Sequence, residues 1–456
     1  MLFSTSVFLF FFLPFVLFFY HALLRNKIKW QNLFLLVSSL FFYAWGEPYF
    51  VLIMLASIIV NWGFALLVDF FRDRIYVRYL LFLVVLFNIL LIFTFKYLNF
   101  FCTTLNDVFN TDIIIPSIAL PIGISFFTFQ SISYVIDVYR RKGHVQKNPL
   151  NVGLYIALFP QLIAGPIVRY ETIAQQIENR VVTFSDFSEG VKRFIIGLGK
   201  KVLIANNVAL VADHCFTLTE ENLTAPLAWL GILCYTLQIY FDFSGYSDMA
   251  IGLGRMFGFH FLENFNYPYI SKSISEFWRR WHISLGSWFR DYVYIPLGGN
   301  RVSKVRLYVN LFIVWFLTGL WHGANWTFII WGIMYFILLA FEKTISFEKR
   351  RLLGLGNVYT LFFVILGWVF FRADSISSAI TYISSMFSCK KWIITPILNY
   401  YVSEYSIWIL IGILFSIPMK RLNNKFIFDI YLLFIFILSI LYIIKGNYNP
   451  FIYFNF

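Results

Sequence analysis

The sequence predicts an all-α, polytopic integral membrane protein with about 11–13 transmembrane or re-entrant helices. Hydrophobic residues make up 60% of the 456 residues and charged residues only 13%, against roughly 25% charged residues in soluble domains. Apolar runs of spanning length follow one another with short charged loops between them, which leaves no room for a sizeable soluble domain. We therefore expect one membrane-embedded domain over residues 1–456.

The apolar runs place about a dozen spans along the chain. We expect them at 2–21, 31–46, 49–69, 79–97, 113–137, 190–212, 226–253, 307–320, 324–341, 355–371, 404–418 and 427–444. The first run has no basic residue before it and no small-residue cleavage pattern after it, so we expect a retained span and not a removed signal peptide.

The stretch from Leu154 to Tyr170 does not fit a simple span, because it is short and contains Pro160, Gly165 and Pro166. Broken backbone at membrane depth is tolerated only where protein or a water-filled cavity satisfies its polar groups. Two interpretations stay open: a re-entrant or kinked segment that lines a pocket, and a helix that lies on the surface.

Residues 269–306 predict an amphipathic helix at the cytoplasmic membrane interface. Apolar side chains recur there at three- and four-residue steps, as on one helical face: Ile274, Phe277, Trp278, Trp281, Leu285, Trp288, Phe289 and Tyr292. Charged side chains are interleaved off that face, which is typical of a helix lying in the interface plane. Seven basic and two acidic residues between Lys272 and Arg306 favour the cytoplasmic side. We expect the helix to end near Pro296–Gly299.

Basic residues gather in alternate loops, and this sets the expected orientation. The basic loops contain Arg25, Lys27 and Lys29; Arg72, Arg74 and Arg78; Arg140, Arg141 and Lys142; Lys200 and Lys201; and Lys420, Arg421 and Lys425. Acidic or neutral loops alternate with several of them, such as 106–112 and 213–222. The positive-inside rule then places the basic loops in the cytoplasm and the amino terminus outside. The net charge of +13 is therefore not a nucleic-acid signature.

Several functional classes find no support in the sequence. The four cysteines, Cys102, Cys215, Cys234 and Cys389, show no metal-ligand or paired spacing. No metal cluster, Gly-rich nucleotide loop or Gly-x-Ser-x-Gly motif occurs, so we expect no metal, no phosphate-driven pump and no serine hydrolase.

His322 is the ionisable side chain that stands out most. It is the one acidic, basic or imidazole group between Leu307 and Phe341, and such a group at membrane depth normally lines a cavity and has a function. An apolar wall disfavours imidazolium, so we expect a neutral ring that accepts a proton as a general base. Gly319 and Gly323 leave room for a substrate or for a helix break.

The same stretch of 35 residues is too long for one upright span, because a helix of that length extends about 50 Å. It must be a kinked helix or a hairpin that turns near Gly319–Gly323. Basic residues at both ends favour the hairpin: Lys304, Arg306, Lys343, Lys349, Arg350 and Arg351.

His282 lies on the apolar face of the predicted interfacial helix, four residues after Trp278 and seven before Phe289. A packed histidine bonded to a carbonyl is the ordinary interpretation. An inward-tilted interfacial helix would instead bring His282 to the floor of a cavity whose wall carries His322.

Several motifs in one order closely resemble the membrane-bound O-acyltransferase family. They are 240–252 (YFDFSGYSDMAIG), 275–284 (SEFWRRWHIS), 288–292 (WFRDY) and 318–325 (TGLWHGAN). Further motifs point to its bacterial alginate O-acetyltransferase-like branch: 121–126 (PIGISF), 164–166 (AGP), 368–374 (WVFFRAD) and 450–454 (PFIYF). The similarity covers nearly the whole chain, and no motif position departs from the pattern.

The resemblance implies a multi-helix enzyme around a central tunnel, with a catalytic core at about 115–345. His322 and His282 would be its catalytic residues. The implied reaction takes an acetyl group from a cytoplasmic thioester donor, with acetyl-CoA the expected substrate and no permanently bound cofactor. The implied partners are membrane lipids, a separate extracytoplasmic acetyltransferase protein and a polysaccharide acceptor, and the implied location is the bacterial inner membrane.

Four further side chains are candidate donor contacts: Arg279, Arg280, Trp281 and Asn325. Asn325 would share a helical face with His322 if the helix continues, and it would then orient the ring or donate to an oxyanion; a packing amide is the alternative. Asp242 and Asp248 would pair with Arg279 or Arg280, and structural bracing is favoured over donor contact.

Three other functions stay open. D-alanyl transfer from a carrier protein to teichoic acid uses the same chemistry. A polytopic transporter would show two related halves with paired broken helices, and no second copy of the unusual segments is visible. A non-catalytic scaffold that recruits an outer-face acetylase is the third.

Overall fold

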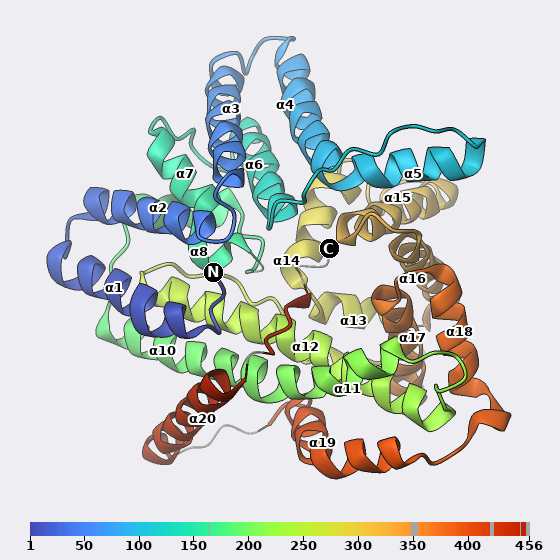
Figure 1. Ribbon diagram of the computed structural model, residues 1–456. Helices are drawn as coiled ribbons and strands as arrows, with labels where there is room; N and C mark the ends of the chain where they lie inside the picture. Colours follow the sequence, from blue (N-terminus) through green and yellow to red (C-terminus); the bar gives the residue numbers. More distant parts are fainter. Residues whose placement is uncertain (164, 348–353, 420–423, 447, 453–456) are drawn as a thin grey trace. The chain divides into compact units, whose positions relative to one another are not determined.

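The structure, a computed structural model, describes residues 1–163, 165–347, 354–419, 424–446 and 448–452. Within these ranges the regular elements are all helices, without any strand, and nine helices are long and apolar enough to cross a membrane. Figure 1 shows the helices in chain order. The prediction of an all-α, multi-span protein is confirmed.

The chain forms two compact units, of which unit 1 comprises Met1–Phe194 and Ser247–Leu262. Its helices are η1 Phe8–Phe12, α1 Leu13–Phe18, η2 Phe19–Leu23, α2 Ile28–Ala44, α3 Phe50–Phe70, α4 Val77–Ile92, η3 Phe93–Tyr97, α5 Leu98–Phe109, α6 Ile124–Tyr139, α7 Pro149–Ala157, α8 Phe159–Leu162, α9 Tyr170–Glu178 and most of α10 Phe184–Gly199.

Unit 2 comprises Ile195–Tyr246 and Glu263–Phe456. Its helices are η4 Lys200–Ala205, α11 Asn206–Thr217, most of α12 Ala225–Met256, η5 Pro268–Ile270, α13 Ile274–Arg280, α14 Ile283–Phe289, η6 Arg290–Tyr294, α15 Lys304–His322, α16 Trp326–Thr344, α17 Leu355–Arg372, α18 Ile376–Phe387, η8 Cys389–Lys391, α19 Pro396–Phe415 and α20 Lys425–Lys445.

Nine of the predicted spans each overlap one of the long apolar helices. The exceptions have physical reasons. The span expected at 2–21 is a 16-residue helix, Phe8–Leu23, and the one at 31–46 is the 17-residue α2. The span expected at 113–137 is wrong in its first half: residues 111–121 form no helix, because Pro116 and Pro121 lack the N–H that a helix needs.

Several sequence features lie outside the described residues. They are Ala164 of the 164–166 motif, the last two residues of the 450–454 motif, and the basic residues Lys349, Arg350, Arg351, Lys420 and Arg421.

The segment from Leu154 to Tyr170 is broken, as its sequence predicts. It forms α7 and α8, and residues 166–169 then run without regular structure to α9. Side chains from Leu154 to Leu162 are fully buried, so the segment is enclosed in protein and does not lie on the surface. The backbone N–H of Phe159, freed at the break, donates to Ser39 Oγ on α2 at 3.0 Å, as membrane-depth backbone requires.

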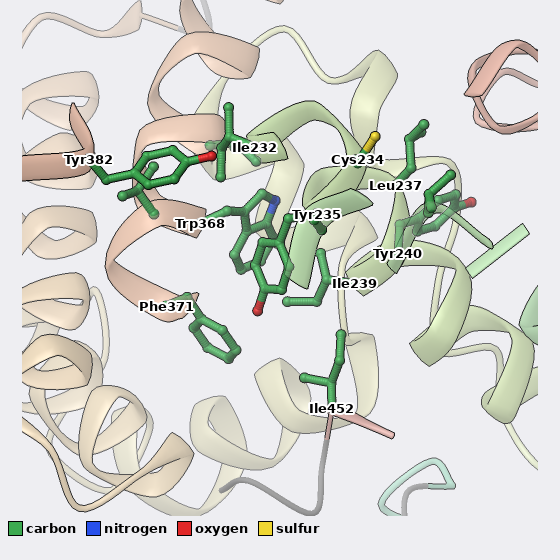
Figure 2. Close-up of a cluster of buried hydrophobic side chains, with 14 of the residues drawn as sticks. Ile232, Cys234, Tyr235, Leu237, Ile239, Tyr240, Trp368, Phe371, Tyr382 and Ile452 are labelled. Atoms are coloured by element: carbon green, nitrogen blue, oxygen red, sulfur yellow. The ribbon is translucent and has the colours of Figure 1, made fainter. Parts of the chain in front are cut away.

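Unit 2 is built on a large aromatic core. Figure 2 shows side chains of α12 meeting Trp368 and Phe371 of α17 and Tyr382 of α18, with Ile452 of the C-terminal segment beside them. The Tyr382 hydroxyl donates to the Ala228 carbonyl at 2.9 Å. The sequence did not predict α18, because its twelve residues are too few for a span.

A buried ion pair holds the C-terminal segment in this core. Lys201 Nζ lies 2.7 Å from Asp242 Oδ1, with both side chains at most 2% exposed. Lys201 also donates to the Pro450 carbonyl, and the Ile452 N–H donates to Asp242 Oδ2 at 3.1 Å. The assignment of Lys200 and Lys201 to a basic loop is therefore wrong, because both lie inside the continuous helix 184–217.

Candidate functional site

His322 is the last residue of α15 and is only 5% exposed. Its ring centroid lies 5.0 Å from the ring centroids of Trp321, Trp331 and Phe371, with all three pairs edge to face. The imidazole is thus enclosed by aromatic side chains of α15, α16 and α17.

The stretch 307–341 is a hairpin, which settles the alternative between hairpin and kinked helix. Helix α15 ends at His322 and α16 begins at Trp326. The two helices approach closely at glycines: a Cβ on Gly319 would lie 2.5 Å from the Phe328 carbonyl oxygen, and one on Gly323 would lie 2.2 Å from the Phe328 ring. The room that these glycines leave is therefore filled by α16.

Asn325 does not share a helical face with His322, because the helix ends before it. Its Oδ1 accepts from the Thr327 N–H at 3.1 Å and caps α16, while its Nδ2 donates to the Asp374 carbonyl at 2.9 Å. These two bonds fix the turn beside His322, and a contact with the donor stays a prediction.

The interfacial helix predicted over 274–292 is broken at His282. Helix α13 ends at Arg280, His282 adopts a left-handed backbone with φ of +46°, and α14 begins at Ile283. The predicted placement of His282 on a continuous apolar helix face is therefore wrong. His282 is nevertheless buried, with 2% of its surface exposed, because the turn itself packs inward.

Asn264 fixes the tautomer of His282. The Ser284 N–H, which can only donate, lies 3.1 Å from Asn264 Oδ1, so this atom is the carboxamide oxygen. His282 Nδ1 lies 3.3 Å from the same oxygen and must donate to it. The ring proton is then on Nδ1, and the lone pair on Nε2 can act as a base.

Burial lowers the pKa of His282 to about 3 from its ordinary value of 6.5, because removal from water disfavours the charged ring. His282 lies outside the nine candidate spans. It is thus neutral near pH 7, as a proton acceptor must be before it reacts.

One indole joins the two histidines. The Trp321 ring lies 5.9 Å from the His282 ring and 5.0 Å from the His322 ring, centroid to centroid. Both imidazoles belong to unit 2, although forty residues separate them in the chain. The structure therefore brings the two predicted catalytic residues into contact with the same aromatic side chain.

The other predicted donor contacts lie on α13 or just after it. Arg280 Nε pairs with Glu276 Oε1 at 2.9 Å, and its Nη1 donates to the Asn266 carbonyl at 3.1 Å. Trp281 is buried and packs against Trp368, with ring centroids 4.9 Å apart.

The proposed bracing of Arg280 by Asp242 or Asp248 is wrong. Asp242 pairs with Lys201, and Asp248 pairs with Arg193 at 2.6 Å. Arg279 is the third residue of the 279–281 group, and its contact with the donor stays a prediction. Within the described ranges no three His, Cys, Asp or Glu side chains gather in a way that would hold a metal ion.

Two residues beside the histidines were missed by the sequence reasoning. Asn264 lies 18 residues before His282 and Phe371 lies 49 residues after His322, so no helical or strand spacing relates them. Phe371 does belong to the 368–374 motif, so this motif is the signal in the sequence that could have identified it.

Comparison with known proteins places the chain among acyltransferases. The model of the MBOAT, membrane-bound O-acyltransferase family matches residues 143–385. The chain is 46% identical to the probable alginate O-acetylase AlgI of Pseudomonas aeruginosa over 400 residues, which cover 86% of this chain and 76% of that protein.

Two other relatives have different acceptors in their names. The peptidoglycan O-acetyltransferase of Helicobacter pylori is 38% identical over 85% of this chain and 80% of its own length. The teichoic acid D-alanyltransferase of Bacillus subtilis is 31% identical over 55% of this chain and 68% of its own length.

Proposed function

Because the chain belongs to the membrane-bound O-acyltransferase family, we propose that it passes acetyl groups across a bacterial inner membrane for O-acetylation of an extracytoplasmic polysaccharide. That it is an O-acyltransferase and a multi-pass integral membrane protein follows from the family and from the nine apolar helices. The acetyl group, the acceptor and the direction of transfer are the proposal. The two more similar relatives, both named for O-acetylation, favour acetyl over D-alanyl transfer.

The proposed donor is a cytoplasmic thioester, acetyl-CoA, used as a substrate. His322 takes the proton of the acceptor hydroxyl as its oxygen forms the ester bond to the acetyl carbon. The carbon–sulfur bond breaks, and the leaving thiolate takes the proton from the His322 imidazolium, which restores the neutral base. His282 is the second catalytic residue, with Nε2 as its reactive nitrogen.

The observation that carries this proposal is the pair of buried imidazoles that both contact the Trp321 ring. A thioester carbonyl reacts slowly with a hydroxyl unless a base removes the proton in the transition state, a contribution of about 10²–10⁴-fold. Two observations fit that requirement: the chain belongs to a family of acyltransferases, and it holds two enclosed imidazoles. A central tunnel to the pair, and donor contacts from Arg279, Arg280, Trp281 and Asn325, are part of the proposal.

The test is hydrolysis of acetyl-CoA by the purified protein in proteoliposomes, in which water takes the place of the acceptor hydroxyl and the donor thiol is released. We expect His322→Ala and His282→Ala each to lower the rate by at least about 10²-fold. His260→Ala is the matched control, because His260 is half-exposed and belongs to unit 1; it should keep the full rate.

Other outcomes would replace the proposal. Thiol release with a D-alanyl carrier protein and none with acetyl-CoA would favour teichoic acid D-alanylation. Solute transport that survives His322→Ala would favour a transporter. Unchanged polysaccharide acetylation in cells carrying both histidine variants would favour a scaffold for an outer-face acetylase.

The partner protein and the domain bounds are also part of the proposal. An extracytoplasmic acetyltransferase partner would complete transfer to the polymer. A single acyltransferase domain over residues 1–456, with its catalytic core at about 115–345, is also proposed.

A further inference from the structure

We propose that Glu342 is a positioning residue that sets α13, and with it the His282 turn, against the α15–α16 hairpin that carries His322. The inference rests on the proposed function, since it gives Glu342 a role in turnover through those histidines. Glu342 lies near the end of α16 and is 2% exposed. A carboxylate in a membrane-spanning helix is costly, and it is retained where it has a specific partner or function.

The partners of Glu342 are at the start of α13. Its Oε1 accepts from the Ile274 N–H at 2.6 Å. Its Oε2 accepts from the Ser275 N–H at 2.9 Å and from the Ser275 hydroxyl at 2.7 Å. Ser273 caps the next N–H, that of Glu276, at 3.0 Å. The carboxylate thus takes backbone donors that a helix cannot satisfy internally, and its charge strengthens those bonds.

Helix α13 needs such an anchor because it has only seven residues, too few to be stable as an isolated helix. Its side packing comes from the same face of α16. Trp278 contacts Trp331 and Tyr335, with ring centroids 5.4 and 4.8 Å away. Trp331, Tyr335 and Glu342 are four and seven residues apart, so they lie on one face of α16.

This face connects the two histidines. At one end of α16, Trp331 contacts the His322 ring; at the other, Glu342 holds the start of α13. The end of α13 leads directly into the His282 turn, where the Asn266 N–H donates to the Arg280 carbonyl and the Ile283 N–H to the Asn264 carbonyl, both at 2.9 Å. A shift of α13 would therefore move His282 relative to His322.

The chemistry of the anchor requires a carboxylate. Both oxygens of Glu342 accept hydrogen bonds, whereas glutamine has one oxygen and an NH₂ group that can only donate. In Glu342→Gln the NH₂ group would face either the Ile274 N–H or the two donors of Ser275. The substitution keeps the size of the side chain and removes one acceptor.

The experiment measures kcat and KM for acetyl-CoA in Glu342→Gln, with and without His282→Ala, beside Glu404→Gln as control. Glu404 is an exposed glutamate of α19 in the same unit. We expect Glu342→Gln to lower kcat by up to about 100-fold, as a misplaced catalytic group does, with KM within about twofold. In the His282→Ala background, Glu342→Gln should lower kcat by no more than about twofold. The effects of two coupled residues are not additive, and the imidazole that Glu342 positions is already absent.

A second readout needs no turnover. Mass spectrometry follows the modification of each histidine by diethyl pyrocarbonate in the folded, detergent-solubilised protein. His282, buried in the parent, should react faster in Glu342→Gln and at the parental rate in Glu404→Gln. Should Glu342→Gln fail to fold, Ser275→Ala removes only the hydroxyl donor and should show a smaller change of the same kind.

Equal losses of kcat in both backgrounds, or unchanged His282 reactivity in the folded variant, would overturn the proposal and leave Glu342 a stabilising cap. If the parent protein turns over no thioester, the proposed function fails. The modification rates then still decide whether Glu342 positions His282.

Discussion

At the scale of single residues, the hydrogen bond between His282 and Asn264 determines what the imidazole can do. A neutral carboxamide oxygen fixes the proton on Nδ1 without adding charge. Burial is the cause that lowers the pKa of His282. The ring is held as a neutral base whose Nε2 has the lone pair.

Replacing that oxygen by a carboxylate should change the pH profile. In Asn264→Asp the new charge favours imidazolium and raises the pKa of His282. A base works only when unprotonated, so activity falls as the pH drops through that pKa. We expect the acid limb of kcat/KM for thiol release to move to higher pH by about one pH unit or more. The rate at pH 8, well above that pKa in both proteins, should be less affected than the rate on the acid limb itself.

Ser284→Ala is the control for this change, because it removes a neutral hydroxyl that donates to the same oxygen and lies 3.5 Å from Nδ1. It adds no charge and leaves the bond between Asn264 and Nδ1 in place. Its acid limb should stay near the parental position. An unmoved acid limb in Asn264→Asp would mean that His282 does not titrate in the rate-limiting step.

Single residues also show how far the candidate site could be predicted from the sequence. The buried position of His322 was predicted because one ionisable group in a long apolar stretch is conspicuous, and its catalytic role stays a prediction. The location of His282 was found for the wrong reason, since a left-handed residue ends the helix whose face was used. Asn264 and Glu342 were not found, because their roles depend on contacts across 18 and 67–68 residues of chain.

At the scale of elements, the α15–α16 hairpin depends on backbone contact at opposed glycines. A Cβ on Gly319 would lie 3.4 Å from Gly332 Cα, and a Cβ on Gly332 would lie 2.5 Å from the Trp315 carbonyl oxygen. Small residues allow such close helix packing in membranes. The hairpin in turn holds His322 against Trp331.

Gly332→Ala should therefore destabilise the protein and lower its activity. The new methyl group meets backbone, which cannot rotate away, so the helices must separate; overpacking of this kind costs about 1–3 kcal/mol. We expect a lower apparent melting temperature in detergent and slower thiol release at a temperature where the variant is still folded.

Gly63→Ala is the matched control for this prediction. Gly63 also lies within a spanning helix, α3, but a Cβ there has no neighbour within 4 Å. Alanine is favoured over glycine in a helix by about 0.5–1 kcal/mol, so this variant should melt no lower than the parent. If Gly332→Ala had the same apparent melting temperature as Gly63→Ala, the close packing of α15 and α16 would be contradicted.

At the scale of the whole molecule, apolar length and composition predicted twelve spans, and nine of them overlap the long apolar helices of the described residues, because burial in lipid imposes a minimum run of apolar residues. Short elements escaped this reasoning. Helices α13 and α14 depend on tertiary contacts, and residues 111–121 are apolar without being helical. Hydropathy reports where a segment is buried and not which conformation it takes.

The orientation in the membrane is a prediction that labelling can test. Basic loops are retained in the cytoplasm, so the loop with Arg72, Arg74 and Arg78 should be inside. The helical stretch Val77–Phe109 separates it from Asp112, which should then be outside. Asp73 and Asp112 are both exposed, as is Cys389, whereas the other three cysteines are buried.

In a Cys389→Ser background, an impermeant maleimide should label Asp112→Cys in intact spheroplasts and Asp73→Cys only after the membrane is opened. Cys389→Ser alone should stay unlabelled in both conditions. Labelling of Asp73→Cys from outside would invert the topology and put the amino terminus in the cytoplasm. The loops with the basic residues would then face away from a cytoplasmic thioester, and the proposed direction of acetyl transfer would have to be reversed or abandoned.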